Sequence, residues 1–190
     1  AVVEDIYLSM GFHIPGLAHP HTPAIDLLAV ILGQGDSSRL QIELKRRKQL
    51  VTDIYSYAYT PRDLGLFTVG AAMGGDRFEE AYEAIIRQLQ RLAQEEVALE
   101  ELAKARRMVE TDAVYGGETT QGLARKLGYY ETITGDPDYE PRYLHAISAV
   151  TPADIRAVAR QYLDPDRLTV SIVAPKVGSK RPKATGEKGL

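Results

Sequence analysis

The sequence of 190 residues contains no cysteine and no tryptophan. A chain without cysteine forms no disulfide, has no thiolate nucleophile and lacks the sulfur ligands on which many zinc sites depend. Its four histidines are the only nitrogen ligands, and none has the spacing of a zinc hydrolase motif, in which two histidines lie one helical turn apart beside a carboxylate. His19 and His21 flank Pro20 in a predicted loop, so we interpret them as loop residues and predict no metal site.

The chain also lacks an excess of positive charge and any long apolar run. Its 23 basic and 26 acidic residues give a net charge of −3, which disfavours nucleic acid and anionic membranes as partners. The longest apolar run, Leu27–Leu32, is far shorter than the roughly 18 residues of a membrane span. We expect a soluble protein, cytoplasmic or periplasmic if it is bacterial.

The N-terminus lacks the features of a secretory leader. It opens on Ala1, and Glu4 and Asp5 stand where such a leader would carry positive charge, so we expect a piece excised from a longer protein. Residues 1–175 fit one domain, because their length is close to the roughly 150 residues that a domain typically has. Residues 176–190 carry five basic residues against one acidic residue and few large apolar ones, which predicts a disordered basic tail.

Alternating polar and apolar residues predict several strands. The alternation from Ile6 to Ile14 is typical of a strand with one buried face. Residues 51–60 and 66–73 are rich in residues that favour strands, and the short turn between them predicts an antiparallel hairpin. A last alternation over 168–174 predicts a closing strand.

Apolar residues at helical spacing predict helices over most of the remaining chain. The apolar run that follows Pro23 fits either a helix or a buried strand. Helices are predicted at the apolar stripes within 78–92, 102–109, 123–130 and 143–150. Thr151 as N-cap and Pro152 at the first helical position predict the start of a further helix. This order predicts an α+β fold, an antiparallel or mixed sheet with several helices packed on one face.

A glycine-rich segment invites a comparison with dinucleotide-binding motifs. Gly33 and Gly35 follow an apolar run, and Asp53 lies about twenty residues further on. The third glycine of that motif is replaced by Ser38, and Asp53 lies inside a predicted antiparallel strand. We therefore interpret Gly33 as the end of a helix, followed by the cap of the next.

A second pattern leaves two interpretations open. Tyr55, Tyr57 and Tyr59 alternate along one predicted strand and therefore share one of its faces. That face is either a surface that contacts peptides or a half-buried face of the sheet.

Three motifs in a fixed order give the sequence a family resemblance. They are ILGQGDSSRL at 31–40, ELKRRKQLVTDIYSYAYTPRDLGLFTVGAAM at 43–73 and AISAVTPADIRAVARQYLDPDRLTVSIVAP at 146–175. Together they resemble the insulinase/pitrilysin family of zinc peptidases, which includes the mitochondrial processing peptidases and the respiratory-complex core proteins. The resemblance extends from about Ile6 to Pro175 and is to the second, non-metal-binding domain of that family.

The resemblance implies a processing-peptidase-like metallohydrolase fold without catalytic residues of its own. In this family such a domain packs against a homologous domain that carries an inverted His-x-x-Glu-His zinc motif, in the same chain or in a separate subunit. The two enclose a chamber for unfolded peptides. This chain is then expected to form half of the chamber and to help bind substrate, while the zinc belongs to the partner domain. By itself it is expected to bind no zinc and to hydrolyse nothing.

The resemblance also points to two positions. In many active members this domain contributes an arginine and a tyrosine, seven residues apart, that grip the substrate. The matching stretch LKRRKQLVT places Lys45 and Thr52 there, so they are the candidate substrate-binding residues. A cation is kept, but the planar fork of arginine and the reach of the phenol are lost. Tyr55 is expected on the opposite strand face from Thr52.

Because Lys45 and Thr52 replace the arginine and tyrosine of active members, two other interpretations stay open besides a domain of a working peptidase. The first is a structural or accessory subunit, related to the processing-peptidase or core proteins, with no proteolytic role. The second is an unrelated α+β binding module.

Overall fold

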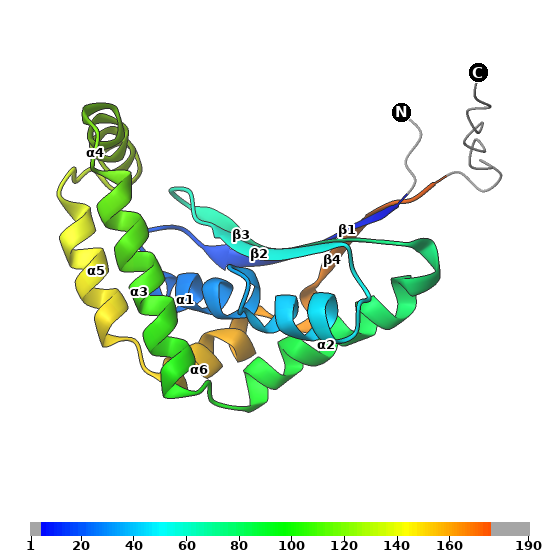
Figure 1. Cartoon of the computed structure of the whole chain (residues 1–190). Helices are drawn as coiled ribbons and strands as arrows, with labels where there is room; N and C mark the ends of the chain where they lie inside the picture. The colour runs from blue at the N-terminus through cyan, green and yellow to red at the C-terminus, as the bar shows by residue number, and fades with distance from the viewer. Residues whose placement is uncertain (1–4, 176–190) are drawn as a thin grey trace, which may run out of the picture.

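The computed structural model describes residues 5–175, which form a four-stranded antiparallel sheet with helices on one of its faces (Figure 1). The strands are β1 (Ile6–Pro15), β2 (Asp53–Tyr59), β3 (Leu64–Met73) and β4 (Thr169–Val173), in the order β2-β3-β1-β4. The α-helices are α1 (Thr22–Gly33), α2 (Phe78–Gln94), α3 (Leu99–Gly116), α4 (Thr120–Thr134), α5 (Tyr139–Ala149) and α6 (Pro152–Tyr162). The shorter helical turns are η1 (Gln41–Arg47), η2 (Gly75–Arg77) and η3 (Pro165–Arg167). The α+β prediction is confirmed, and the sheet is antiparallel rather than mixed.

The alternation in the sequence corresponds to the two faces of the sheet. Four apolar residues of β1 that face the helices are at most 3% exposed: Leu8, Met10, Phe12 and Ile14. β1 pairs with β3 along its whole length, with Ile6 opposite Met73, and with β4 over its first half, with Tyr7 opposite Val173. The predicted hairpin is the antiparallel pair β2–β3.

The helices begin and end where local signals place them. The ambiguous apolar run is α1, which has a proline in its first turn and ends at Gly33, as interpreted from the sequence. α6 begins with a capping box, since Thr151 Oγ1 accepts a hydrogen bond from the Asp154 backbone N–H at 3.2 Å and the Asp154 carboxylate accepts one from the Thr151 N–H at 2.8 Å. No described helix is both long enough and apolar enough to cross a bilayer.

One predicted stripe is not buried. The helix expected over 123–130 forms as α4, but Leu123 is 46% exposed and Leu127 39% exposed. Helical spacing shows which face of a helix is apolar, and tertiary structure decides whether another element covers that face. Here α4 stands at one end of the sheet, away from the core between the sheet and α1 (Figure 1). The predicted tail, 176–190, lies outside the described residues.

Candidate functional site

The sheet has one face that the described helices leave exposed. In Figure 1, α1, α2 and α6 lie beneath the sheet, and the hairpin of α4 and α5 rises past one end to the level of the other face. We call that other face the open face. The residues that strand alternation places on it are Tyr7, Ser9, Gly11, His13 and Pro15 of β1, Asp53, Tyr55, Tyr57 and Tyr59 of β2, Leu64, Leu66, Thr68, Gly70 and Ala72 of β3, and Thr169, Ser171 and Val173 of β4.

The register lines up these residues in rows across the strands. Two of the rows are Tyr55–Gly70–Ser9–Ser171 and Tyr57–Thr68–Gly11–Thr169. Each begins with a tyrosine on β2 and continues with small residues. Tyr55, Tyr57 and Tyr59 are 46%, 44% and 61% exposed, so the aromatic row lies on an accessible surface. The open face is therefore broad, with three of its four tyrosines along β2 and the fourth, Tyr7, on β1.

The tyrosines of β2 are held in position by their neighbours. The ring of Tyr55 lies over Gly70, where a Cβ atom would come within 2.3 Å of the ring carbon Cζ. The rings of Tyr55 and Tyr57 are stacked, with centroids 6.0 Å apart and planes 21° apart. Rigid aromatic side chains lose little conformational freedom when they bind a partner, so this row is suited to contact another molecule.

The open face carries little charge. Asp53 is its only carboxylate, and the Asp53 Oδ1 lies 3.3 Å from the Nζ of Lys45. The remaining polar groups are hydroxyls and the imidazole of His13. Such a surface supplies stacking, apolar contact and hydrogen bonds.

The structure places the two candidate substrate-binding residues at one corner of the sheet. Lys45 lies on η1, and its ion pair with Asp53 brings its ammonium group to the margin of the open face. Thr52 precedes β2, and both its backbone N–H and its hydroxyl donate to the carbonyl oxygen of Ala72, at 2.8 and 2.9 Å. Asp53 thus adjoins both residues, and each of the two side chains has an intramolecular partner.

An acidic group that the sequence did not single out lies beneath the sheet. Tyr143 of α5 donates a hydrogen bond from its Oη to Oδ2 of Asp26 on α1, over 2.6 Å. Removal from water raises the pKa of Asp26 to about 7, against the opposing effect of this hydrogen bond. Burial and the nearby charge of Asp26 raise the pKa of Tyr143 above its usual range. The two residues are 117 positions apart, so no local pattern could indicate the pair.

Two further tyrosines fasten the α4–α5 hairpin to the body of the domain. Tyr139 Oη donates to the carbonyl oxygen of Leu17 at 3.0 Å, and Tyr129 Oη donates to that of Thr60 at 3.4 Å. Thr60 directly follows β2. These bonds fix the hairpin beside the end of the sheet, where it bounds the open face.

His19 and His21 lie side by side, without a third potential metal ligand beside them among the described residues. The rings of His19 and His21 lie 4.7 Å apart, and Nδ1 of His21 lies 2.9 Å from the Oη of Tyr162. Burial and the neighbouring His21 lower the pKa of His19. Within residues 5–175 no three potential ligand side chains come together to hold a metal ion. The described residues therefore do not fit a zinc site, which takes at least three protein ligands.

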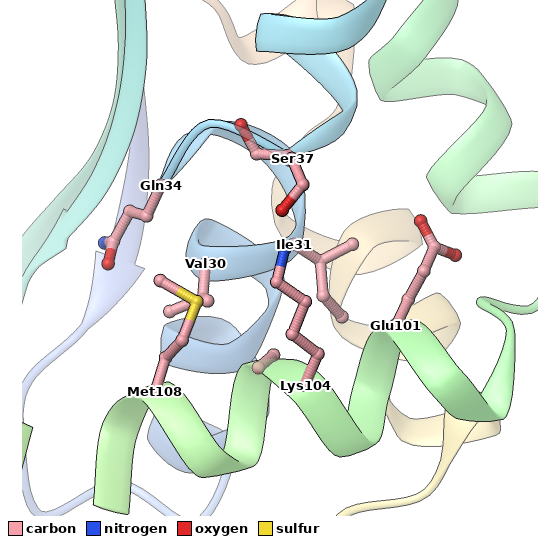
Figure 2. Close-up of a pocket in the computed structure, with 9 residues that line it drawn as sticks. Val30, Ile31, Gln34, Ser37, Glu101, Lys104 and Met108 are labelled. Atoms are coloured by element: carbon pink, nitrogen blue, oxygen red, sulfur yellow. The ribbon is translucent and has the colours of Figure 1, made fainter. Parts of the chain in front are cut away.

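The glycine-rich segment forms a loop between α1 and η1, so it follows a helix and not a strand. A strand before the loop is what a dinucleotide site requires. Figure 2 shows the small cavity under this loop, with Glu101, Lys104 and Met108 of α3 beneath Ser37. Its volume of about 30 Å³ suits a single water molecule, and the buried Oγ of Ser38, which has no hydrogen-bond partner among residues 5–175, lines it.

Comparisons with known proteins agree with this architecture. A family model described as the peptidase M16 inactive domain matches residues 2–109. An uncharacterized zinc protease of Streptomyces coelicolor is 31% identical over 174 residues, which are 90% of this chain and 37% of that protein. A protease from Helicobacter pylori superposes with a TM-score of 0.83 at 24% identity, over 91% of this chain and 42% of that chain. The peptidase M16 inactive domain from Pseudomonas fluorescens superposes with a TM-score of 0.82 at 18% identity, over 95% and 43% of the two chains.

The matches differ in what they cover. The chain spans about two fifths of the length of the curated relatives it matches, whereas those relatives cover about nine tenths of this chain. The two superpositions, at less than 25% identity, demonstrate a shared fold.

Proposed function

The chain belongs to the peptidase M16 inactive-domain family, and on this premise we propose that it forms the non-catalytic half of a zinc metallopeptidase and contacts unfolded peptide substrates with its open face. In this proposal a homologous domain, in the same chain or in a second subunit, holds the zinc and carries out the hydrolysis. The present chain forms one wall of the chamber in which the peptide lies.

The observation that carries the proposal is the composition of the open face. A surface that accepts many unfolded peptides needs contacts that do not depend on one sequence, and tyrosine, serine, threonine and glycine supply these through stacking and adaptable hydrogen bonds. The stacked Tyr55 and Tyr57 beside small residues have this character. The near absence of charge also fits a surface that does not select peptides by net charge.

Lys45 and Thr52 have a supporting role in this proposal. The ammonium group of Lys45 reaches the margin of the open face through Asp53, so a carbonyl oxygen of a peptide could share it. Both side chains already have partners within the domain, and neither offers the bidentate fork of arginine or the ring of tyrosine. We therefore assign most of the substrate contact to the tyrosines.

The test is reconstitution with the zinc-binding domain that occurs with this chain in nature. Cleavage of an unfolded peptide is expected only when both parts are present, and Tyr57→Ser should lower kcat/KM about fivefold, the loss of roughly 1 kcal/mol of aromatic contact. The control is Tyr115→Ser, which removes a tyrosine that is 66% exposed at the end of α3, outside the open face.

Two outcomes would contradict the proposal. Equal losses for Tyr57→Ser and Tyr115→Ser would exclude the open face as the contact surface. A reconstituted pair with a loaded zinc site and no peptide cleavage would instead favour a structural or accessory subunit.

A further inference from the structure

β4 is an edge strand of the described sheet. It pairs with β1 over Tyr7–Gly11 on one side, and no described residue pairs with its other side. All five residues of Thr169–Val173 are exposed. The backbone N–H and C=O groups on this side therefore have no strand partner among residues 5–175, an arrangement that native proteins usually cover or guard because it can pair with another chain.

The helix layer does not extend fully beneath this strand. Val170 and Ile172 point toward the helices, yet they are 39% and 47% exposed. Their neighbours on β1 in the same register, Met10 and Leu8, are 0% and 3% exposed. Apolar surface thus remains uncovered beside β4, and one more strand at this edge would cover it.

The sequence of β4 carries none of the devices that discourage edge pairing. The segment TVSIV contains no charged residue, no proline and no glycine. Three of its residues are valine or isoleucine and a fourth is threonine, all of which favour extended backbone.

We propose that β4 pairs antiparallel with β4 of a second copy of this chain, about a twofold axis at Ser171. In this register Ser171 faces Ser171 of the second copy, Val170 faces Ile172, and Thr169 faces Val173. The segment is complementary to itself, since apolar residues meet beneath the sheet and no like charges face each other. A second copy supplies this pattern without any further partner, and a twofold contact of this kind closes after two copies.

The twofold axis stands perpendicular to the sheet, so each face of one copy continues into the same face of the other. Val170 and Ile172 of the two copies then lie together on the helix side. The two open faces merge into one surface on a sheet of twice the width. This inference concerns assembly and does not depend on what the open face binds.

Sedimentation equilibrium tests the assembly with the 190-residue chain as it stands. The apparent mass should rise from 21.0 kDa toward twice that value as the concentration increases through the micromolar range. Ile172→Lys places an ammonium group against Val170 of the second copy and should weaken the association at least tenfold. Leu64→Lys adds the same charge at a position of β3 that is 73% exposed and far from β4, so it should leave the association unchanged. Circular dichroism verifies that both variants fold.

Cross-linking tests the register, because the natural sequence contains no cysteine. Ser171→Cys lies on the proposed axis, so mild oxidation should produce a disulfide-linked dimer. Thr169→Cys lies on the same face of the strand but is offset by four residues from its own copy, about 14 Å. That separation exceeds the roughly 7 Å between Cα atoms that a disulfide can span.

The outcomes either support or overturn the proposal. A dimer that Ile172→Lys weakens, Leu64→Lys preserves and Ser171→Cys captures selectively supports it. A monomer at every concentration overturns it. A dimer that is insensitive to Ile172→Lys, or one in which both cysteine variants cross-link equally, overturns it as well, since the contact would lie on another surface.

Discussion

The two edge strands of the sheet differ in what lies beside them. At β2, the side-chain amide of Gln41 donates to the carbonyl oxygen of Ile54, and the backbone of Gly33 packs against the N–H of Ser56. Ile54 is 0% exposed and Ser56 1% exposed, whereas Ile172 in β4 is 47% exposed. Both strands are rich in residues that favour extended backbone. The helix layer, here α1 with η1, thus reaches β2 and covers its inner face, whereas it stops short of β4, although both strands favour extended backbone.

The sharpest test of this comparison uses the same substitution on both edges. Ile54→Ala removes a fully buried side chain and should lower the free energy of unfolding by about 4 kcal/mol. Ile172→Ala removes one that is half exposed and should cost about 1 kcal/mol. Urea denaturation, at a concentration where the chain is monomeric, measures both. Similar losses at the two positions would show that the edges are equally covered.

The second prediction concerns a substitution that separates α1 from β2. A Cβ atom at Gly33 would lie 2.4 Å from the backbone N of Ser56, so Gly33→Ala must push α1 away from β2. We expect a loss of about 3 kcal/mol from overpacking and from weakening of the hydrogen bond of Ser56 Oγ to the Ala29 carbonyl. The control is Gly128→Ala in α4, where nothing lies within 4 Å of the added atom. That variant should gain up to about 1 kcal/mol, because alanine favours helices more than glycine does. A loss at Gly128 equal to that at Gly33 would contradict the packing explanation.

The third prediction concerns the attachment of α1, the helix that covers the inner face of β2. The pKa of Asp26 is raised from 3.8 to about 7, so between these values the folded chain keeps a proton that the unfolded chain has lost. The contribution of this carboxyl group to stability is therefore fully present below about pH 4 and falls as the pH rises through about 7. Asp26→Asn keeps the shape and the acceptor for Tyr143 but does not titrate.

The variant should thus be about 4 kcal/mol more stable than the natural chain at pH 8 and nearly equal to it at pH 4. Urea denaturation across this pH range measures the difference between the two proteins. Tyr143→Phe, which removes only the hydroxyl donor, serves as the companion variant. A difference that stays constant with pH would rule out Asp26 as the titrating group.

The smallest expected effect concerns the corner where the covered edge meets the open face. Lys45→Arg together with Thr52→Tyr restores the two side-chain types that active relatives are expected to use, and should raise peptide turnover by less than tenfold in the reconstituted enzyme. The increase is small because the open face already supplies most of the contact in our proposal. Arg77→Lys, at an exposed ion pair on η2, is the control. Unchanged turnover would limit this corner to an architectural role.

The features that follow from local pattern were predictable from the sequence. The alternation from Ile6 to Ile14 identified β1, the short connection identified the β2–β3 hairpin, and Thr151 with Pro152 marked the start of α6. Each of these signals is contained within a few neighbouring residues. The alternation also placed Tyr55, Tyr57 and Tyr59 on one face, although it left open whether that face is covered.

The remaining features depend on contacts between distant parts of the chain. The approach of Gly33 to Ser56 and the pairing of Asp26 with Tyr143 require the helices to be in place, so neither has a local signal. The same holds for the exposed stripe of α4. The assignment of Lys45 and Thr52 came from family resemblance, and their role stays a prediction.

In the assembly that we propose, the contact between α1 and β2 at Gly33 favours a pair of copies over a longer array. A subunit with one available strand joins a single neighbour and stops, whereas a subunit with two available strands can add copies without end and grow into a ribbon. In this chain the missing side chain of Gly33 lets the end of α1 pack against the backbone of β2 at Ser56. A methyl group added at Gly33 separates α1 from β2 and is therefore expected to make a second strand available for pairing in the assembly that we propose.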